Sequence, residues 1–234
     1  GFPAASDRLQ ERKAADKLQA ACTGQTAAVR SVEKKQKSTQ PPKLYDLTSL
    51  QRDGNRLMGY TAQQVLDYAQ ALYEKKLLTY PRTDSNYLTE DTAATVPGLV
   101  EVAVQSLPFS VEVGPPDVAR VVDGSKVSDH HALLPTMQVR SDTLAALPAG
   151  ERNVLTLVIV RLLCAVGEKQ VYEDTAAALE CGGVSFSARG RVVTVPGWKA
   201  IEQMFLSTLK QKTEKEEPEA RALPPLAEGQ TFSG

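Results

Sequence analysis

The sequence predicts an α+β protein with a mostly helical middle and two partly β flanks. Apolar residues recur at helical spacing from Ala62 to Tyr73, and residues 151–166 form the most apolar helical stretch. After Val171 the pattern changes to β-branched runs punctuated by glycine. The pair Pro41-Pro42 interrupts the chain before the helical part and marks a candidate domain boundary.

The first flank combines a helix and a strand. Residues 5–21 are rich in Ala, Leu, Gln and Lys and contain no Gly or Pro, which predicts a helix ending near Gly24. Thr26 to Val32 alternates as a strand does, and Glu33 to Lys43 then becomes polar. We therefore expect the strand to stop near Val32.

A helix in the middle region leads into the most informative motif of the chain. Thr61 and Gln64 have the spacing of a capping box. Behind them, one helical face is formed by Ala62, Val65, Leu66, Ala69, Leu72 and Tyr73. The helix should end near Lys75-Lys76, so that residues 77–79 form a short extended piece before Tyr80. Pro81 fixes its own φ and keeps the tyrosine out of the α region.

The remaining elements follow from the same signals. The expected helices are Thr89–Val96, Leu99–Leu107, residues 151–166 closed by Gly167, and Trp198–Leu209. The expected strands are Val171–Leu179, Val184–Ala188 and Arg191–Val195, with turns at Gly182-Gly183 and Gly190. Lys210–Glu219 is expected to be a charged loop, and the residues from Leu223 onward pair with nothing.

Composition excludes several classes of protein. The chain has 234 residues, 42% of them hydrophobic, a net charge of −1, and no apolar run near the length of a membrane span. Its three cysteines are widely spaced, which predicts small buried residues in a reducing compartment rather than a disulfide or zinc framework. A near-neutral charge argues weakly against nucleic-acid binding. Residues 1–45 nevertheless hold nine Lys/Arg against four acids, either as a solvated face or for phosphate contact.

The octapeptide from Leu78 to Ser85 places Tyr80 two residues from Arg82. A phenol is a poor nucleophile while protonated, since its ordinary pKa is near 10. A fixed guanidinium favours the phenolate and binds phosphate oxygens, so the pair suits attack on a phosphodiester. The alternative is a surface loop whose aromatic ring packs on the preceding helix.

Two further segments carry candidate polar contacts. His130 and His131 are the only histidines, and a histidine can donate to a phosphate oxygen or move a proton; the alternative is a pair of capping or core residues. A three-histidine metal site within the chain is excluded by this count. The run from Thr48 to Gln51 can either bind phosphates and sugars or cap a helix. No phosphate-cradling glycine loop is present.

Four segments in one order resemble the type IA DNA topoisomerases, most closely the topoisomerase III subgroup. They are Leu47-Thr48-Ser49-Leu50-Gln51, Ala69-Gln70-Ala71-Leu72-Tyr73-Glu74, Leu78-Thr79-Tyr80-Pro81-Arg82-Thr83-Asp84-Ser85, and Ser128-Asp129-His130-His131-Ala132-Leu133-Leu134-Pro135-Thr136. Gly197-Trp198 and Leu223-Pro224-Pro225-Leu226 also fit this family. The resemblance spans nearly the whole chain.

This resemblance implies roles for individual residues. Tyr80 matches the nucleophile that cuts one DNA strand and keeps its 5′-phosphate as a phosphotyrosine. Arg82 matches the residue that steadies the scissile phosphate. The residues expected to contact single-stranded DNA are His130, Ser49, Gln51 and Thr79. Because the protein–DNA link conserves the bond energy, resealing needs no nucleotide cofactor.

The resemblance also implies a domain organisation. We expect a helical tyrosine domain at 46–165 inserted into a β-rich arch made of residues 1–45 and 166–234. Family members add a Toprim domain, whose acidic cluster holds Mg²⁺, and a domain whose groove guides the single strand. Neither is recognisable here, so the chain resembles a fragment that is inactive alone. A start at Gly1-Phe2-Pro3, without methionine, agrees with an excised piece.

Two other functions are compatible with parts of the pattern. A non-catalytic single-stranded DNA-binding module could retain the motif, although aromatic residues are only 6% and are not clustered. A conjugative relaxase also forms a 5′-phosphotyrosine, but it needs a metal held by three histidines. For the topoisomerase interpretation we expect a bacterial, cytoplasmic and nucleoid-associated protein.

Overall fold

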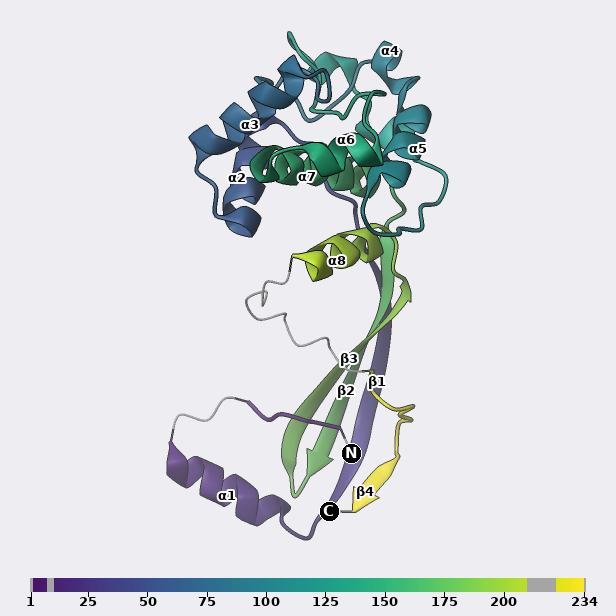
Figure 1. The fold of residues 1–234 in the computed structure, drawn as a ribbon. Coiled ribbons are helices and arrows are strands. Elements are labelled where there is room, and N and C mark those ends of the chain that lie inside the picture. Colours follow the sequence, from purple (N-terminus) through teal and green to yellow (C-terminus); the bar gives the residue numbers. More distant parts are fainter. Residues whose placement is uncertain (1, 8–10, 210–221, 234) are drawn as a thin grey trace. The chain divides into compact units, whose positions relative to one another are not determined.

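The computed structural model describes residues 2–7, 11–209 and 222–233, which fall into two compact units (Figure 1). The first unit comprises Gly1–Thr39, Val171–Val195 and Lys212–Gly234, and the second comprises Gln40–Gln170 and Pro196–Gln211. Among the described residues, no helix is both long and apolar enough to cross a bilayer. The predicted loop Lys210–Glu219 lies outside the described residues.

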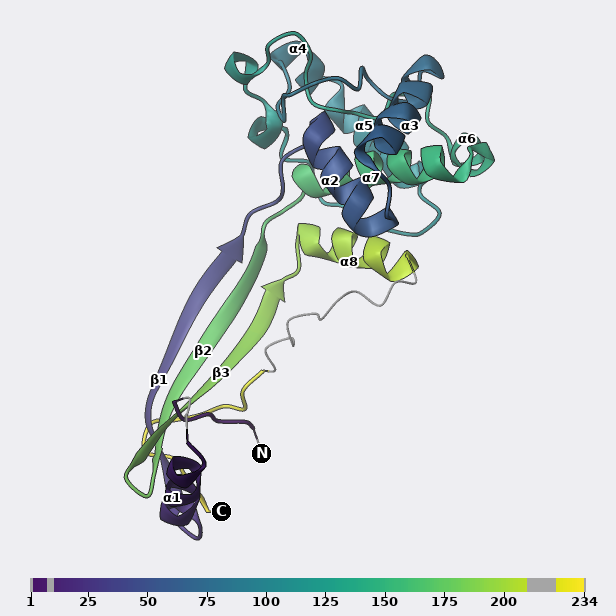
Figure 2. The ribbon, with the colours of Figure 1, turned by 90° about the vertical axis from the view of Figure 1, so that its left-hand side faces the viewer.

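The first unit is built on a four-stranded sheet with the order β3-β2-β1-β4. Figure 2 shows β1, β2 and β3 side by side. Its strands are β1 (Thr26–Thr39), β2 (Gln170–Cys181), β3 (Val184–Val195) and β4 (Thr231–Ser233). β2 and β3 form an antiparallel hairpin in which Cys181 pairs with Val184. The two-residue turn needs positive φ at both positions, and Gly182 and Gly183 supply φ values of 56° and 78°. The helix α1 (Arg12–Cys22) completes the unit.

Three expectations for this unit are wrong. The first helix begins at Arg12, and Ala5 instead exchanges two backbone hydrogen bonds with Ser187. β3 runs unbroken through Gly190, where a turn was expected. The terminal residues are not unpaired, because β4 lies antiparallel to the start of β1, with Ala27 opposite Phe232. In each case a partner strand supplies hydrogen bonds that the local pattern does not reveal, and for Ala5 and β4 that partner lies far along the chain.

The polar continuation of β1 is a fourth correction. The strand runs to Thr39 instead of stopping near Val32. Its charged side chains are matched by acids on β2: Arg30 lies 3.0 Å from Glu180, and Lys37 lies 2.9 Å from Asp174. Exposed pairs of this kind add little stability each, but opposite charges on neighbouring strands favour the pairing. Charge complementarity thus lets a polar stretch remain a strand.

The second unit is helical and surrounds α7 (Ala149–Ala165) (Figure 1). Nearly the whole circumference of α7 is buried, from Val154 to Ala165. Its neighbours include α2 (Leu47–Met58), α3 (Ala62–Glu74), α5 (Val96–Ser106), α6 (Ser141–Ala146) and α8 (Trp198–Thr208). The unit also holds α4 (Glu90–Ala93) and two 3₁₀ turns, Val118–Val121 and Gly124–Lys126. The apolar segment 151–166 is therefore a core helix, as predicted.

Other predictions for the helical unit meet with mixed outcomes. The capping box at Thr61 and Gln64 is confirmed, with both reciprocal bonds present. Tyr73 does not share the buried face of α3, since its side chain is 41% exposed. The expected domain organisation assigns α8 to the second part of the arch, residues 166–234. In the structure α8 lies instead in the helical unit, because Trp198, Ile201 and Phe205 are buried in that unit's core.

A close approach of α2 and α3 gives a test of this packing. A Cβ built on Gly54 would lie 2.6 Å from Cγ2 of Val65, too close for any real contact. Gly54→Ala should therefore lower the free energy of unfolding by about 1–3 kcal/mol, despite the better helix propensity of alanine. Urea denaturation monitored by circular dichroism measures the change.

The matched control is Gly98→Ala in α5, where the added Cβ would meet only the flexible end of Met137. That variant should be as stable as the parent protein. Adding Val65→Ala to Gly54→Ala should recover part of the loss in a double-mutant cycle. Equal stabilities of the Gly54 and Gly98 variants would contradict the close helix approach.

Candidate functional site

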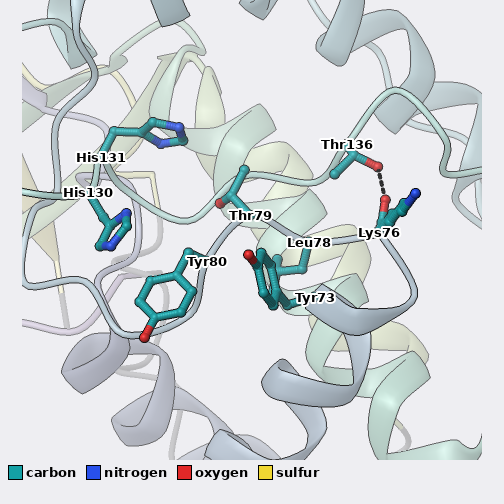
Figure 3. Close-up of a pocket in the computed structure, with 8 residues that line it drawn as sticks. All are labelled: Tyr73, Lys76, Leu78, Thr79, Tyr80, His130, His131 and Thr136. Atoms are coloured by element: carbon teal, nitrogen blue, oxygen red, sulfur yellow. Dashed lines mark hydrogen bonds between the residues drawn. The ribbon is translucent and has the colours of Figure 1, made fainter.

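An open pocket of about 380 Å³ in the helical unit contains Tyr80 (Figure 3). Its lining residues come from the end of α3, from the segment after it and from a distant loop. They are Tyr73, Lys76, Leu78, Thr79, Tyr80, His130, His131 and Thr136. The pocket thus combines the two sequence segments that carry the tyrosine and the histidines.

Backbone pairing fixes the segment that leads to Tyr80. Helix α3 ends at Glu74, and Lys76 adopts a positive φ of 60°, which turns the chain out of the helix. The hydroxyl of Thr136 donates to the Lys76 carbonyl at 2.6 Å, which ties this turn to the distant loop (Figure 3). Leu78, 1% exposed, then forms an antiparallel bridge with Pro135. The extended piece expected at residues 77–79 is therefore one side of a short ladder.

Thr79 makes a two-way connection to the same loop. Its backbone N–H donates to the Leu134 carbonyl at 3.0 Å, and its Oγ1 accepts from the Leu134 N–H at 2.9 Å. These bonds use a backbone and a side-chain group of one residue and fix its orientation. Tyr80 follows directly, on a segment that is held from both sides.

The Tyr80 ring lies among other rings rather than in the core. Its centroid is 4.4 Å from that of His130, with an interplanar angle of 42°. The Tyr73 ring lies 5.4 Å away in an edge-to-face arrangement. The Tyr80 side chain is half-buried, and its hydroxyl has no hydrogen-bond partner within the described part of the chain. A phenolic oxygen so placed is open to a ligand that enters the pocket.

Arg82 is exposed and does not line this pocket. It lies between two buried residues, Pro81 and Thr83, which anchor the backbone on either side. Thr83 Oγ1 donates to the His130 carbonyl at 2.8 Å, and the Thr83 carbonyl accepts from the Leu47 N–H at 3.0 Å. In the described residues no ion pair or hydrogen bond involves the Arg82 side chain. The guanidinium is thus accessible for an anion.

The two histidines differ in their surroundings. His130 is exposed and its ring lies beside Tyr80, whereas the ring of His131 is directed elsewhere (Figure 3). Nδ1 of His131 lies 2.7 Å from the Ala132 carbonyl, so a proton on that nitrogen is donated locally. His130 is therefore the histidine positioned to act with the tyrosine.

Ser49 and Gln51 are not part of the pocket. Ser49 belongs to a capping box at the start of α2, where the Asp46 carboxylate accepts its N–H at 2.6 Å and its hydroxyl accepts the Asp46 N–H at 3.1 Å. The amide of Gln51 donates to the Ala62 carbonyl at 3.0 Å. The helix-cap interpretation of this run thus describes Ser49, and both side chains already have local partners.

Three pocket residues were not singled out from the sequence. The helical pattern predicts Tyr73 on the core face of α3, next to the buried Leu72, but it lines the pocket seven residues before Tyr80. Lys76 and Thr136 flank the ladder that positions Tyr80. The sequence signal for this contact is Thr136, which ends the histidine motif. Its hydroxyl can donate a hydrogen bond to an exposed carbonyl.

The family of the protein follows from a comparison with sequence models of protein families. The model described as DNA topoisomerase matches residues 3–234, nearly the whole chain. The chain belongs to the type IA DNA topoisomerase family. Its mixed fold of helices and a curled antiparallel sheet is the fold of this family.

The chain is also similar in sequence to proteins named as DNA topoisomerases. The chain is 36% identical over 223 residues to DNA topoisomerase 3 of Bacillus licheniformis and 36% identical over 217 residues to that of Bacillus subtilis. These alignments cover 92% and 90% of the chain, but only 30% and 29% of the two relatives. The chain thus spans less than a third of the length of these topoisomerases.

A solved topoisomerase structure has the same fold. Full-length topoisomerase I from Thermotoga maritima matches with a TM-score of 0.69 at 19% sequence identity. The match covers all of this chain and 38% of the other. In the part of the chain that the structure describes, no group of three or more His, Cys, Asp or Glu is suited to hold a metal ion.

Proposed function

We propose that this chain supplies the strand-cleaving tyrosine of a type IA topoisomerase, with Tyr80 as the nucleophile. The observation that carries the proposal is the position of this phenol. It lies in an open pocket, without a hydrogen-bond partner among the described residues, on a segment held by the Thr79–Leu134 bonds. A structural tyrosine would bury its ring or bond its hydroxyl.

The proposed reaction is a reversible transesterification. The Tyr80 oxygen attacks a backbone phosphorus, the bond from phosphorus to the 3′-oxygen breaks, and the 5′-phosphate stays on the tyrosine. The phenol loses one proton, and the departing 3′-oxygen gains one. Religation reverses both transfers, so no nucleotide is consumed. The single-stranded gap allows another strand to pass before resealing.

Accessible side chains near the tyrosine have complementary roles in this proposal. Arg82 binds the scissile phosphate and stabilises the charge that develops on its oxygens. His130, beside the Tyr80 ring, donates to a phosphate oxygen or carries the proton. Thr79 positions the nucleophile through its bonds to Leu134, and only the exposed part of its side chain contacts the strand. Ser49 could contact DNA only by giving up its cap bonds, whereas the bond from Gln51 to Ala62 uses only one N–H of its amide.

The remaining parts of the activity lie outside this chain. We propose that Mg²⁺ is held by a Toprim domain and that the strand reaches Tyr80 through a separate groove domain. The chain alone would then bind single-stranded DNA but not relax a supercoiled plasmid. The protein would act on the bacterial nucleoid, in the cytoplasm.

Covalent trapping tests the proposal. The chain is joined to the regions of its relatives that it does not cover, incubated with a radiolabelled single-stranded oligonucleotide and Mg²⁺, and quenched with detergent. We expect a labelled protein band whose peptide carries the phosphate on Tyr80. A protein that binds the oligonucleotide but gives no adduct would be the non-catalytic binding module instead. An adduct on another residue would remove Tyr80 from its role.

A further inference from the structure

Another tyrosine, seven residues after the proposed nucleophile, has two lysines beside its ring. The Tyr87 ring, half-buried, has the ammonium nitrogen of Lys126 at 4.6 Å from its centroid and that of Lys43 at 5.0 Å. Both lysines are exposed. The pKa of the Tyr87 phenol lies below its ordinary value, first because of hydrogen bonding by Lys43 and further because of the positive charge of Lys126.

Hydrogen bonds tie together the three segments that carry this cluster. The Ser85 hydroxyl donates to the Lys126 carbonyl at 2.8 Å. The amide of Asn86 donates to the Leu44 carbonyl at 3.1 Å, one residue from Lys43. Two residues immediately before Tyr87 thus hold the backbones that present the two lysines, so the three segments of the cluster are fixed relative to one another.

The same connections join the cluster to the proposed active site. Tyr87 accepts a backbone bond from Ala132 at 2.9 Å, in the loop that also carries His130. The stretch from Tyr80 to Tyr87 therefore runs beside the loop from Lys126 to Ala132, with the Thr83–His130 bond between the two ends. A strand whose phosphate reaches Arg82 would have its neighbouring phosphates along this stretch.

The charges of the cluster favour an anionic ligand. Lys126 is paired with Asp123 at 2.6 Å. Lys43 has no carboxylate within salt-bridge distance in the described residues. One positive charge is thus left uncompensated beside a phenolic hydroxyl, which suits an oxyanion with several acceptor atoms. A metal cation would be repelled, and the ring is already engaged with ammonium groups rather than open for base stacking.

We propose that Lys43, Tyr87 and Lys126 form a second phosphate subsite, which holds a backbone phosphate of the single strand near the bond that Tyr80 attacks. This subsite rests on the proposed function, because it needs a strand bound at Tyr80. It would fix the register of the strand, since two phosphates held on one rigid stretch leave the scissile bond little freedom to slide.

Salt-dependent binding tests the subsite. A fluorescein-labelled single-stranded oligonucleotide is titrated with the parent chain, with Lys43→Gln and with Lys169→Gln, an exposed lysine of the same unit that is remote in sequence from the cluster. Losing one phosphate contact should lower the slope of log K against log salt by about 0.7, a weakening of about fivefold at 0.1 M salt. We expect this change for Lys43→Gln and not for Lys169→Gln. Equal slopes for all three proteins would overturn the subsite.

A phosphate-by-phosphate scan sharpens the test. A single neutral methylphosphonate is placed in turn at each position of the oligonucleotide. One position, apart from the scissile phosphate, should weaken binding to the parent chain about fivefold and cause no further loss with Lys43→Gln. Independent losses at every position would contradict a shared contact.

Further measurements separate this inference from the proposed function. Failure of the proposed function would remove the Tyr80 adduct from the parent joined polypeptide, whereas failure of the subsite alone would leave that adduct in place and give Lys43→Gln the parental salt slope. If Lys43→Gln leaves DNA affinity unchanged but weakens association with the missing regions supplied separately, the cluster binds a protein carboxylate and the phosphate subsite is wrong. Thermal unfolding followed by circular dichroism should show equal stability for both lysine variants.

Discussion

Replacing Tyr80 by Phe is expected to abolish the covalent protein–DNA adduct while leaving the fold intact. The substitution removes only the phenolic oxygen, which is the atom that attacks phosphorus in the proposed reaction. That oxygen has no hydrogen-bond partner within the described residues, so the free energy of unfolding should change by less than about 0.5 kcal/mol. Detergent-resistant labelling of the joined polypeptide measures the adduct, and thermal unfolding measures stability.

Tyr68→Phe is the matched control for this prediction. It makes the same chemical change on α3 in the same unit, but Tyr68 does not line the pocket around Tyr80. The control should label like the parent protein. Oligonucleotide binding by Tyr80→Phe should also remain, because one hydroxyl contributes little to binding a polyanion. Measurable adduct from Tyr80→Phe would remove this residue from the chemistry.

Replacing Arg82 by Ala should slow cleavage by about 10²–10³-fold, the usual effect of losing a charged or hydrogen-bonding group aimed at a developing anion. The side chain is exposed and has no partner in the described part of the chain, so its loss should not disturb the fold. Single-turnover cleavage at saturating oligonucleotide isolates the chemical step from binding.

The conservative variant Arg82→Lys distinguishes charge from geometry. Lysine keeps the positive charge but cannot present two parallel N–H groups to one phosphate. We expect a rate between those of the parent and Arg82→Ala. If Arg82→Ala cleaves at the parental rate, the arginine has no part in the reaction and serves only as a solvated charge.

Much of the helical unit follows from local sequence. The core helix α7 shows as an unbroken apolar run, and the start of α3 shows as a capping box, because both depend on residues within one or two turns. The exposure of Tyr73 does not follow from such local signals. It lies next to buried Leu72 at the edge of the helical face, and whether such an edge residue is buried depends on what packs beside it.

The sheet follows much less from local sequence. The second half of β1 is polar and reads as a loop, yet it pairs in the sheet with help from acids on β2, more than 130 residues along the chain. β4 is three residues long and carries no strand signal of its own. Both elements exist because a distant strand offers hydrogen bonds and opposite charges, which a window of neighbouring residues does not contain.

The sequence by itself determined which chemical groups this protein offers: a tyrosine and an arginine two residues apart on a proline-stiffened turn, and a histidine pair followed by Pro135-Thr136. Only the tertiary structure decided that His130 lies against Tyr80 while His131 turns to its own backbone, that Arg82 stays outside the pocket, and that Ser49 is used in a cap. Side-chain chemistry is a property of each residue. Proximity depends on hydrogen bonds such as Thr79–Leu134 and Thr83–His130, which join segments about 50 residues apart.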